Sequence, residues 1–135
     1  MNNTAVIAID GPSASGKTTV GRLLAQKMNC RFLDTGIMYR ALTWAAIRTG
    51  TNSTDSRGLV RLGEKLIIEV VFNDIEEPYI MVDHLDTTPY LRRHDVEQQV
   101  SVVSRIPGVR RSMVAHQRHI AQGGQIVMVG RDIGT

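Results

Sequence analysis

The chain has 135 residues, of which 42% are hydrophobic and 21% charged, values typical of a single soluble domain. Its only cysteine, Cys30, excludes an intrachain disulfide and favours a reducing compartment. The net charge is +3 and most basic residues are arginines, which suit small anionic ligands; nucleic acid is the weaker alternative, because aromatic residues make up only 4%.

The first predicted elements are a strand, a glycine loop and a helix. Residues 5–9 form a short apolar run typical of a buried strand. Gly11, four intervening residues, Gly16, Lys17 and Thr18 then have the G-x-x-x-x-G-K-S/T spacing of a phosphate-binding loop. Apolar residues at helical spacing predict the helix that follows, and Asn29 is its expected end. These apolar residues are Val20, Leu23, Leu24 and Met28.

The chemistry of this loop follows from its position before a helix. Unpaired backbone N–H groups and the helix dipole favour a phosphate at the helix N-terminus. Lys17 adds a mobile positive charge, and the Thr18 hydroxyl can ligate Mg²⁺. The alternative is an ordinary glycine turn with a surface lysine, which the flanking strand and helix disfavour.

A second strand and helix repeat this order. Residues 31–33 read as a strand, and Asp34 and Thr35 are residues that commonly start helices. Alternating strands and helices predict a parallel sheet covered by helices, with ligands beyond the carboxyl ends of the strands. Thr35, Gly36 and Arg40 are expected at that edge, although a solvated helix charge is the simpler account of a lone arginine.

The remaining pattern predicts an insertion and a return to the sheet. A polar linker precedes a helix, and two β-prone runs form an antiparallel hairpin beside the main sheet. Two helices separated by Pro107 and Gly108 then lead to a third core strand, after which come Arg131 and Asp132. The expected ranges are linker 50–58, helix 59–66, hairpin 66–72 and 79–82, helices 94–106 and 109–121, and strand 125–129.

Four segments together carry a resemblance to a known family. IAIDGPSASGKTT, FLDTGIMYRAL, IPGVR and VGRDIGT occur in the order found in bacterial cytidylate kinases, which the chain resembles along essentially its whole length. The resemblance implies an α/β P-loop fold of the nucleoside monophosphate kinase type, in which helices flank a parallel sheet. It also implies a core of residues 1–57 and 106–135, with a monophosphate-binding insert at about 58–105.

The resemblance implies transfer of the γ-phosphoryl group of ATP to CMP or dCMP with Mg²⁺. Lys17, Arg40 and Arg131 would be catalytic, and Thr18 would ligate the metal. The acceptor nucleotide would contact Thr35, Gly36, Arg40, Ser101, Arg110, Arg131 and Asp132, of which Ser101, Arg110 and Asp132 read cytosine. A metal-binding role is the rival for Asp132. ATP would contact Gly11, Pro12, Ser13, Ala14, Ser15, Gly16, Lys17, Thr18 and Thr19.

The sequence departs from the family pattern in two places. Val129 replaces an acidic residue that is frequent before G-R-D, and the chain stops at Thr135, where family members continue into another strand and a lid. We therefore expect the N-terminal part of such a kinase, without a lid. The alternative is a non-catalytic nucleotide-binding module. A different small-molecule P-loop kinase is a third possibility. No basic leader or membrane span is recognisable, so a cytoplasmic location without a membrane partner is expected. We also expect a monomer without nucleic-acid partners.

Overall fold

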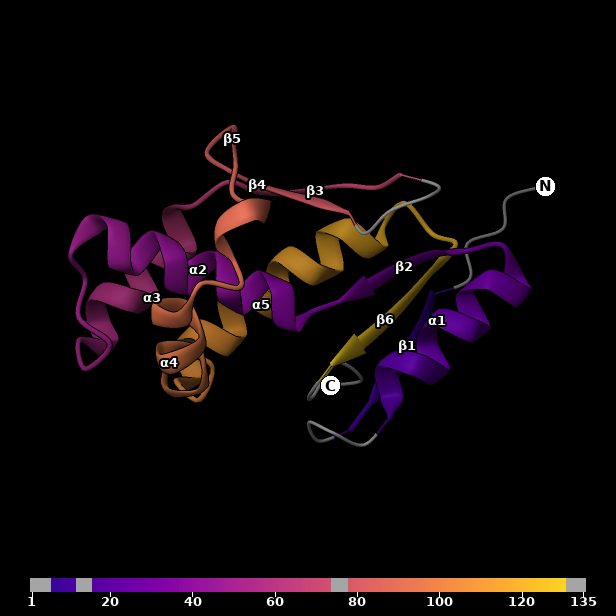
Figure 1. Cartoon of the computed structure of the whole chain (residues 1–135), viewed down its shortest axis with the longest axis horizontal. Coiled ribbons are helices and arrows are strands. Elements are labelled where there is room, and N and C mark those ends of the chain that lie inside the picture. The colour runs from indigo at the N-terminus through magenta and orange to yellow at the C-terminus, as the bar shows by residue number, and fades with distance from the viewer. Residues whose placement is uncertain (1–5, 12–15, 74–77, 131–135) are drawn as a thin grey trace. The chain divides into compact units, whose positions relative to one another are not determined.

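The fold comes from a computed structural model that describes residues 6–11, 16–73 and 78–130 (Figure 1). The chain divides into two compact units. One contains the residues up to Gly36 and those from Gln117 onwards, and the other contains residues 37–116. Among the described residues, no helix combines the length and apolar character that crossing a membrane requires.

The first unit is built on a parallel sheet. Strands β1 (Val6–Asp10), β2 (Arg31–Asp34) and β6 (Ile126–Gly130) lie in the order β1-β6-β2, so the last strand in sequence is the central one. All five residues of β6 are buried, as the middle strand of a covered parallel sheet requires. The predicted parallel sheet with flanking helices is confirmed, and Ala5 lies outside the described residues.

Helix α1 (Lys17–Met28) packs on this sheet through small residues. Its buried residues are Gly21 and Ala25, and a Cβ placed on Gly21 would lie within 3 Å of side-chain atoms of Val129 and Phe32. The large apolar residues whose spacing predicted this helix do not form its buried face, since Val20 and Leu23 are 57% and 58% exposed. The predicted end is confirmed, because Asn29 adopts the left-handed conformation with φ of 54° and caps the helix.

The second unit combines helices with a small antiparallel sheet of order β3-β4-β5. Its large, fully buried side chains come from every long element and include Leu42, Leu59, Ile80, Val96 and Met113. Its elements are α2 (Gly36–Thr49), α3 (Ser56–Lys65), β3 (Ile68–Val71), β4 (Tyr79–Val82), β5 (Leu85–Asp86), the 3₁₀ helix η1 (Thr88–Tyr90), α4 (His94–Val103) and α5 (Pro107–Ala121). Helix α2 begins, and α5 ends, with residues of the first unit.

The hairpin prediction is confirmed, but two helices begin earlier than expected and one strand was not predicted. Helix α3 begins at Ser56 because the Asp55 carboxylate accepts a hydrogen bond from the Gly58 N–H at 3.0 Å. Helix α5 begins at Pro107, since proline suits the first turn of a helix. Strand β5 was not predicted; it follows a two-residue turn in which Asp83 and His84 both have positive φ.

Candidate active site

The predicted phosphate loop joins β1 to α1, and the structure describes both of its ends. The Gly11 N–H donates to the Gly130 carbonyl at 3.2 Å, which ties the start of the loop to the central strand. Gly16 has φ of 79° and caps the N-terminus of α1, a left-handed conformation that favours glycine. Lys17 is the first residue of the helix, and the predicted contacts Pro12, Ser13, Ala14 and Ser15 lie outside the described residues.

A hydrogen-bonded carboxylate links the starts of two helices. The Thr18 hydroxyl donates to Asp34 Oδ2 at 3.3 Å, and the Gly36 N–H donates to Asp34 Oδ1 at 3.0 Å. Hydroxyl and carboxylate oxygens are the ligands that Mg²⁺ prefers. Asp34 was not among the predicted site residues, although its place at the carboxyl end of a core strand was a usable signal.

Thr35 completes the edge of the sheet. Its side chain is 1% exposed, and its N–H and hydroxyl both donate to the Val129 carbonyl, at 2.8 and 3.0 Å. The hydroxyl proton of Thr35 is therefore engaged in a hydrogen bond to the backbone of β6. The acidic residue expected before G-R-D is not needed for these bonds, because Thr35 contacts the backbone of Val129.

In the second unit, Arg40 of α2 is fixed by two acceptors. Its Nη1 group donates to Glu97 Oε1 at 2.7 Å and to the Leu91 carbonyl at 3.2 Å. The hydrogen bond and the charge of Arg40 hold the pKa of Glu97 below its usual value, and Arg92 and His94 act in the same direction. The Arg40 side chain is thus held by two hydrogen bonds and is only partly exposed, so it is not a fully solvated helix charge.

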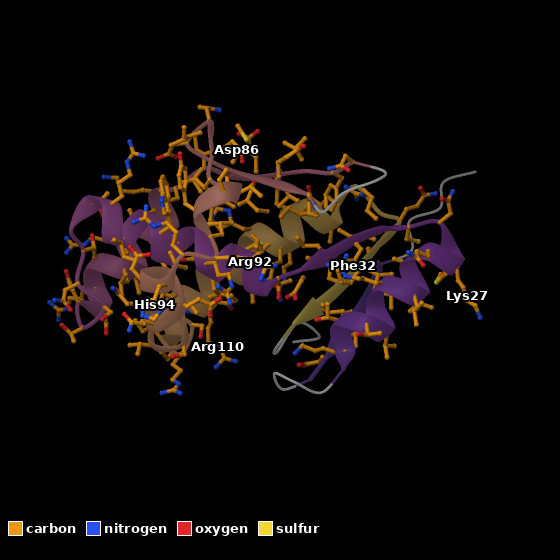
Figure 2. All side chains as sticks on the ribbon, viewed as in Figure 1. Lys27, Phe32, Asp86, Arg92, His94 and Arg110 are labelled. Atoms are coloured by element: carbon orange, nitrogen blue, oxygen red, sulfur yellow. The ribbon has the colours of Figure 1, made fainter. Side chains whose placement is uncertain are left out.

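The two described residues predicted to read cytosine lie on different helices of this unit. Ser101 is exposed on α4, where its carbonyl accepts a hydrogen bond from the Ser104 hydroxyl at 3.1 Å. Arg110 lies on α5, and Figure 2 shows it with Arg92 among the side chains of this unit. Burial raises the pKa of Tyr39, and the positive charge of Arg110 opposes that shift.

Comparison with known proteins identifies the family. A family model described as cytidylate kinase matches residues 7–135. The chain belongs to the cytidylate kinase family. It is similar to proteins named cytidylate kinase from Chloroflexus aggregans (46% identity over 96% of this chain), Desulforamulus reducens (42% over all of it) and Bacillus velezensis (41% over all of it). These matches cover 57%, 60% and 60% of the relatives, so the chain spans about 60% of their length.

Membership of the cytidylate kinase family confirms the resemblance seen in the sequence and the predicted fold class. The roles of the site residues stay predictions. Arg131 and Asp132 lie outside the described residues, and Thr19 is exposed on α1. Within the described ranges, no group of three or more His, Cys, Asp or Glu side chains is placed to hold a metal ion.

Proposed function

We propose that the protein is a nucleoside monophosphate kinase that transfers the γ-phosphoryl group of ATP to CMP or dCMP, giving ADP and CDP or dCDP. The observation that carries this proposal is the family match along residues 7–135, in a chain whose α1 starts at Lys17 behind a left-handed glycine. Relatives at 41–46% identity are named cytidylate kinases. We also propose that the protein is a cytoplasmic monomer whose partners are the nucleotides ATP and CMP or dCMP.

The donor half of the site would lie at the N-terminus of α1. Backbone N–H groups of the loop and the ammonium group of Lys17 would bind the ATP phosphates. The Thr18 hydroxyl would ligate Mg²⁺, and the adjacent Asp34 carboxylate, 3.3 Å away, fits a hard cation as well. The metal, when bound with ATP, neutralises charge on the β- and γ-phosphates.

The acceptor half would use arginines and a polar base pocket. Arg40 and Arg131 would bind the acceptor phosphate, and both arginines would stabilise charge as the phosphoryl group moves. Ser101, Arg110 and Asp132 would read cytosine, whose exocyclic amine suits a carboxylate acceptor. We also propose that about residues 58–105 act as the monophosphate-binding insert, with residues 1–57 and 106–135 as the core.

The test is a coupled assay of ADP release with CMP, dCMP, UMP and AMP as acceptors. We expect CMP and dCMP to be the preferred acceptors, and Lys17→Ala to lower kcat by at least about 100-fold. Lys27→Ala is the matched control, because Lys27 is an exposed lysine in the last turn of the same helix. Equal rates with all four nucleotides would refute the assignment of Ser101, Arg110 and Asp132.

Binding without transfer is the second candidate for these 135 residues by themselves. It is favoured by the extent of the matches, which cover 57–60% of the relatives' length. Calorimetry with ATP and Mg²⁺ alongside the ADP assay separates the candidates. Heat of binding without CMP-dependent ADP release supports binding alone, whereas turnover that Lys17→Ala abolishes supports the kinase.

A further inference from the structure

Among the described residues, both hydrogen-bond acceptors of Arg40 lie on one side of its guanidinium group. Its guanidinium group lies between α2, which carries it, and the first turn of α4, which supplies Glu97. Both acceptors, Glu97 Oε1 at 2.7 Å and the Leu91 carbonyl at 3.2 Å, take hydrogen bonds from the same nitrogen, Nη1. The Arg40 side chain is 21% exposed, so it is partly enclosed and still reachable by a ligand.

In the described ranges, no hydrogen-bond acceptor is paired with the opposite edge of this guanidinium group. An arginine presents Nε–H and Nη2–H along one edge, and this pair matches the spacing of two oxygens on a phosphate or carboxylate. In the part of the chain that the structure describes, the hydrogen bonds of Arg40 go from Nη1 alone. The two contacts thus fix the orientation of the guanidinium plane while its bidentate edge is left for an oxyanion.

We propose that Glu97 is a positioning residue, which holds Arg40 through Nη1 so that the Nε and Nη2 groups face the phosphate of the acceptor nucleotide. The inference rests on the proposed function, since it assumes that Arg40 binds that phosphate. Glu97 itself does not contact the nucleotide. Its contribution is to reduce the number of side-chain orientations that Arg40 would otherwise lose when the phosphate binds.

The supports of Arg40 are themselves well anchored. The Leu91 side chain is fully buried, and its backbone follows η1, where the Thr87 hydroxyl donates to the Ile80 carbonyl of β4 at 2.8 Å. Glu97 lies in the first turn of α4, where a negative charge is favoured by the helix dipole. Both acceptors of the Arg40 Nη1 group therefore belong to well-packed parts of the second unit.

A carboxylate beside a phosphate-binding arginine could also compete with the phosphate for that arginine. If Glu97 competed with the phosphate for the same N–H groups, it would weaken binding of the acceptor. The observed geometry disfavours competition, because a ligand on the Nε and Nη2 edge does not require the Nη1 contact to break. The two accounts predict opposite changes in the KM for CMP, which makes them separable.

The experiment compares Glu97→Ala, Glu97→Gln and Glu64→Ala in the full-length protein. Steady-state kinetics would give kcat, KM for CMP and KM for ATP, with thermal melts to check folding. Loss of the partly exposed contact in Glu97→Ala should raise the KM for CMP about two- to fivefold and leave the KM for ATP unchanged. The Glu97→Gln variant should stay near wild type, because its amide oxygen can still accept from Nη1. Glu64, an exposed glutamate of α3, is the control for lost charge.

A double variant tests whether Glu97 acts through Arg40. In an Arg40→Ala background, Glu97→Ala should cause no further change in the KM for CMP. The inference is overturned if Glu97→Ala lowers that KM, leaves it unchanged, or has the same effect with and without Arg40. Those outcomes leave the proposed function intact as long as the wild type phosphorylates CMP. A wild type that does not phosphorylate CMP refutes the proposed function, and the inference with it.

Discussion

Replacing Gly21 by alanine should destabilise the first unit, because α1 contacts the sheet at this glycine. A Cβ at position 21 would lie 2.5 Å from Val129 Cγ1 and 2.9 Å from Phe32 Cε1, well inside contact distance. Val129 is fully buried and β-branched, so it has little freedom to move aside. Overpacking of this kind costs about 1–3 kcal/mol. A 2.5 Å approach to a buried β-branched side chain places the cost in the upper part of that range, at about 2–3 kcal/mol. Alanine recovers about 1 kcal/mol of helix propensity, so the net loss should be about 1–2 kcal/mol.

Gly63→Ala is the matched control, since Gly63 is also a buried helical glycine. A Cβ there would meet Ser112 Cβ at 3.4 Å and Leu42 Cδ2 at 3.7 Å, which are ordinary contacts. This substitution should be neutral or stabilise the protein by up to about 1 kcal/mol.

Urea denaturation gives the free energy of unfolding for both variants and for Gly21→Ala combined with Val129→Ala. Shortening Val129 removes the closest atom, so Gly21→Ala should cost less in that background, with a coupling of about 1 kcal/mol. The packing argument is refuted if Gly21→Ala unfolds at the wild-type urea concentration, or if Gly63→Ala is equally destabilising.

Three further predictions concern the carboxylates. Asp34→Asn should raise the Mg²⁺ concentration needed for half-maximal ADP release about tenfold, and an unchanged Mg²⁺ dependence would contradict the pairing of Asp34 with Thr18. Asp55→Ala should lower the free energy of unfolding by about 1 kcal/mol through loss of the bond from the Gly58 N–H, which urea denaturation would detect; an unchanged midpoint would argue against the cap. The pKa of Glu97 is lowered from 4.5 by Arg40, so its stabilising effect is present above pH 4.5 and is lost as pH falls through the lowered value. Melting curves of wild type and Glu97→Gln should therefore converge at acidic pH, and a gap that widens there would contradict this sign.

Much of the fold was predictable because its local signals agree. Alternation of apolar runs with helical spacing identified β1, α1, β2 and β6, and the glycine spacing placed the start of α1. Periodicity weighs large apolar residues, so it identified α1 without identifying which of its residues are buried. The structure instead buries Gly21 and Ala25, and close approach of a helix to a sheet depends on small size.

The missed features depend on contacts that sequence spacing does not contain. Strand β5 follows a turn of Asp83 and His84, residues that adopt positive φ less readily than the Asn-Gly pairs that usually signal such turns. The hydrogen bond from Thr18 to Asp34 joins two separate β-α segments. The contact of Arg40 with Glu97 joins residues that are 57 positions apart in the sequence. Neither hydrogen-bond partner can be identified until the tertiary fold is known.

The strand order has a consequence for how the protein is made. Strands β1 and β2 leave the ribosome early, but each pairs with β6 and neither pairs with the other. Val6 and Arg31 both pair with Ile126, so the three strands cannot form their sheet until residue 126 has been synthesised. Residues 37–116 are continuous in sequence and are available to fold in the interval. Translation therefore orders the assembly, because the three-stranded sheet of the first unit can pair only after residues 37–116 have left the ribosome.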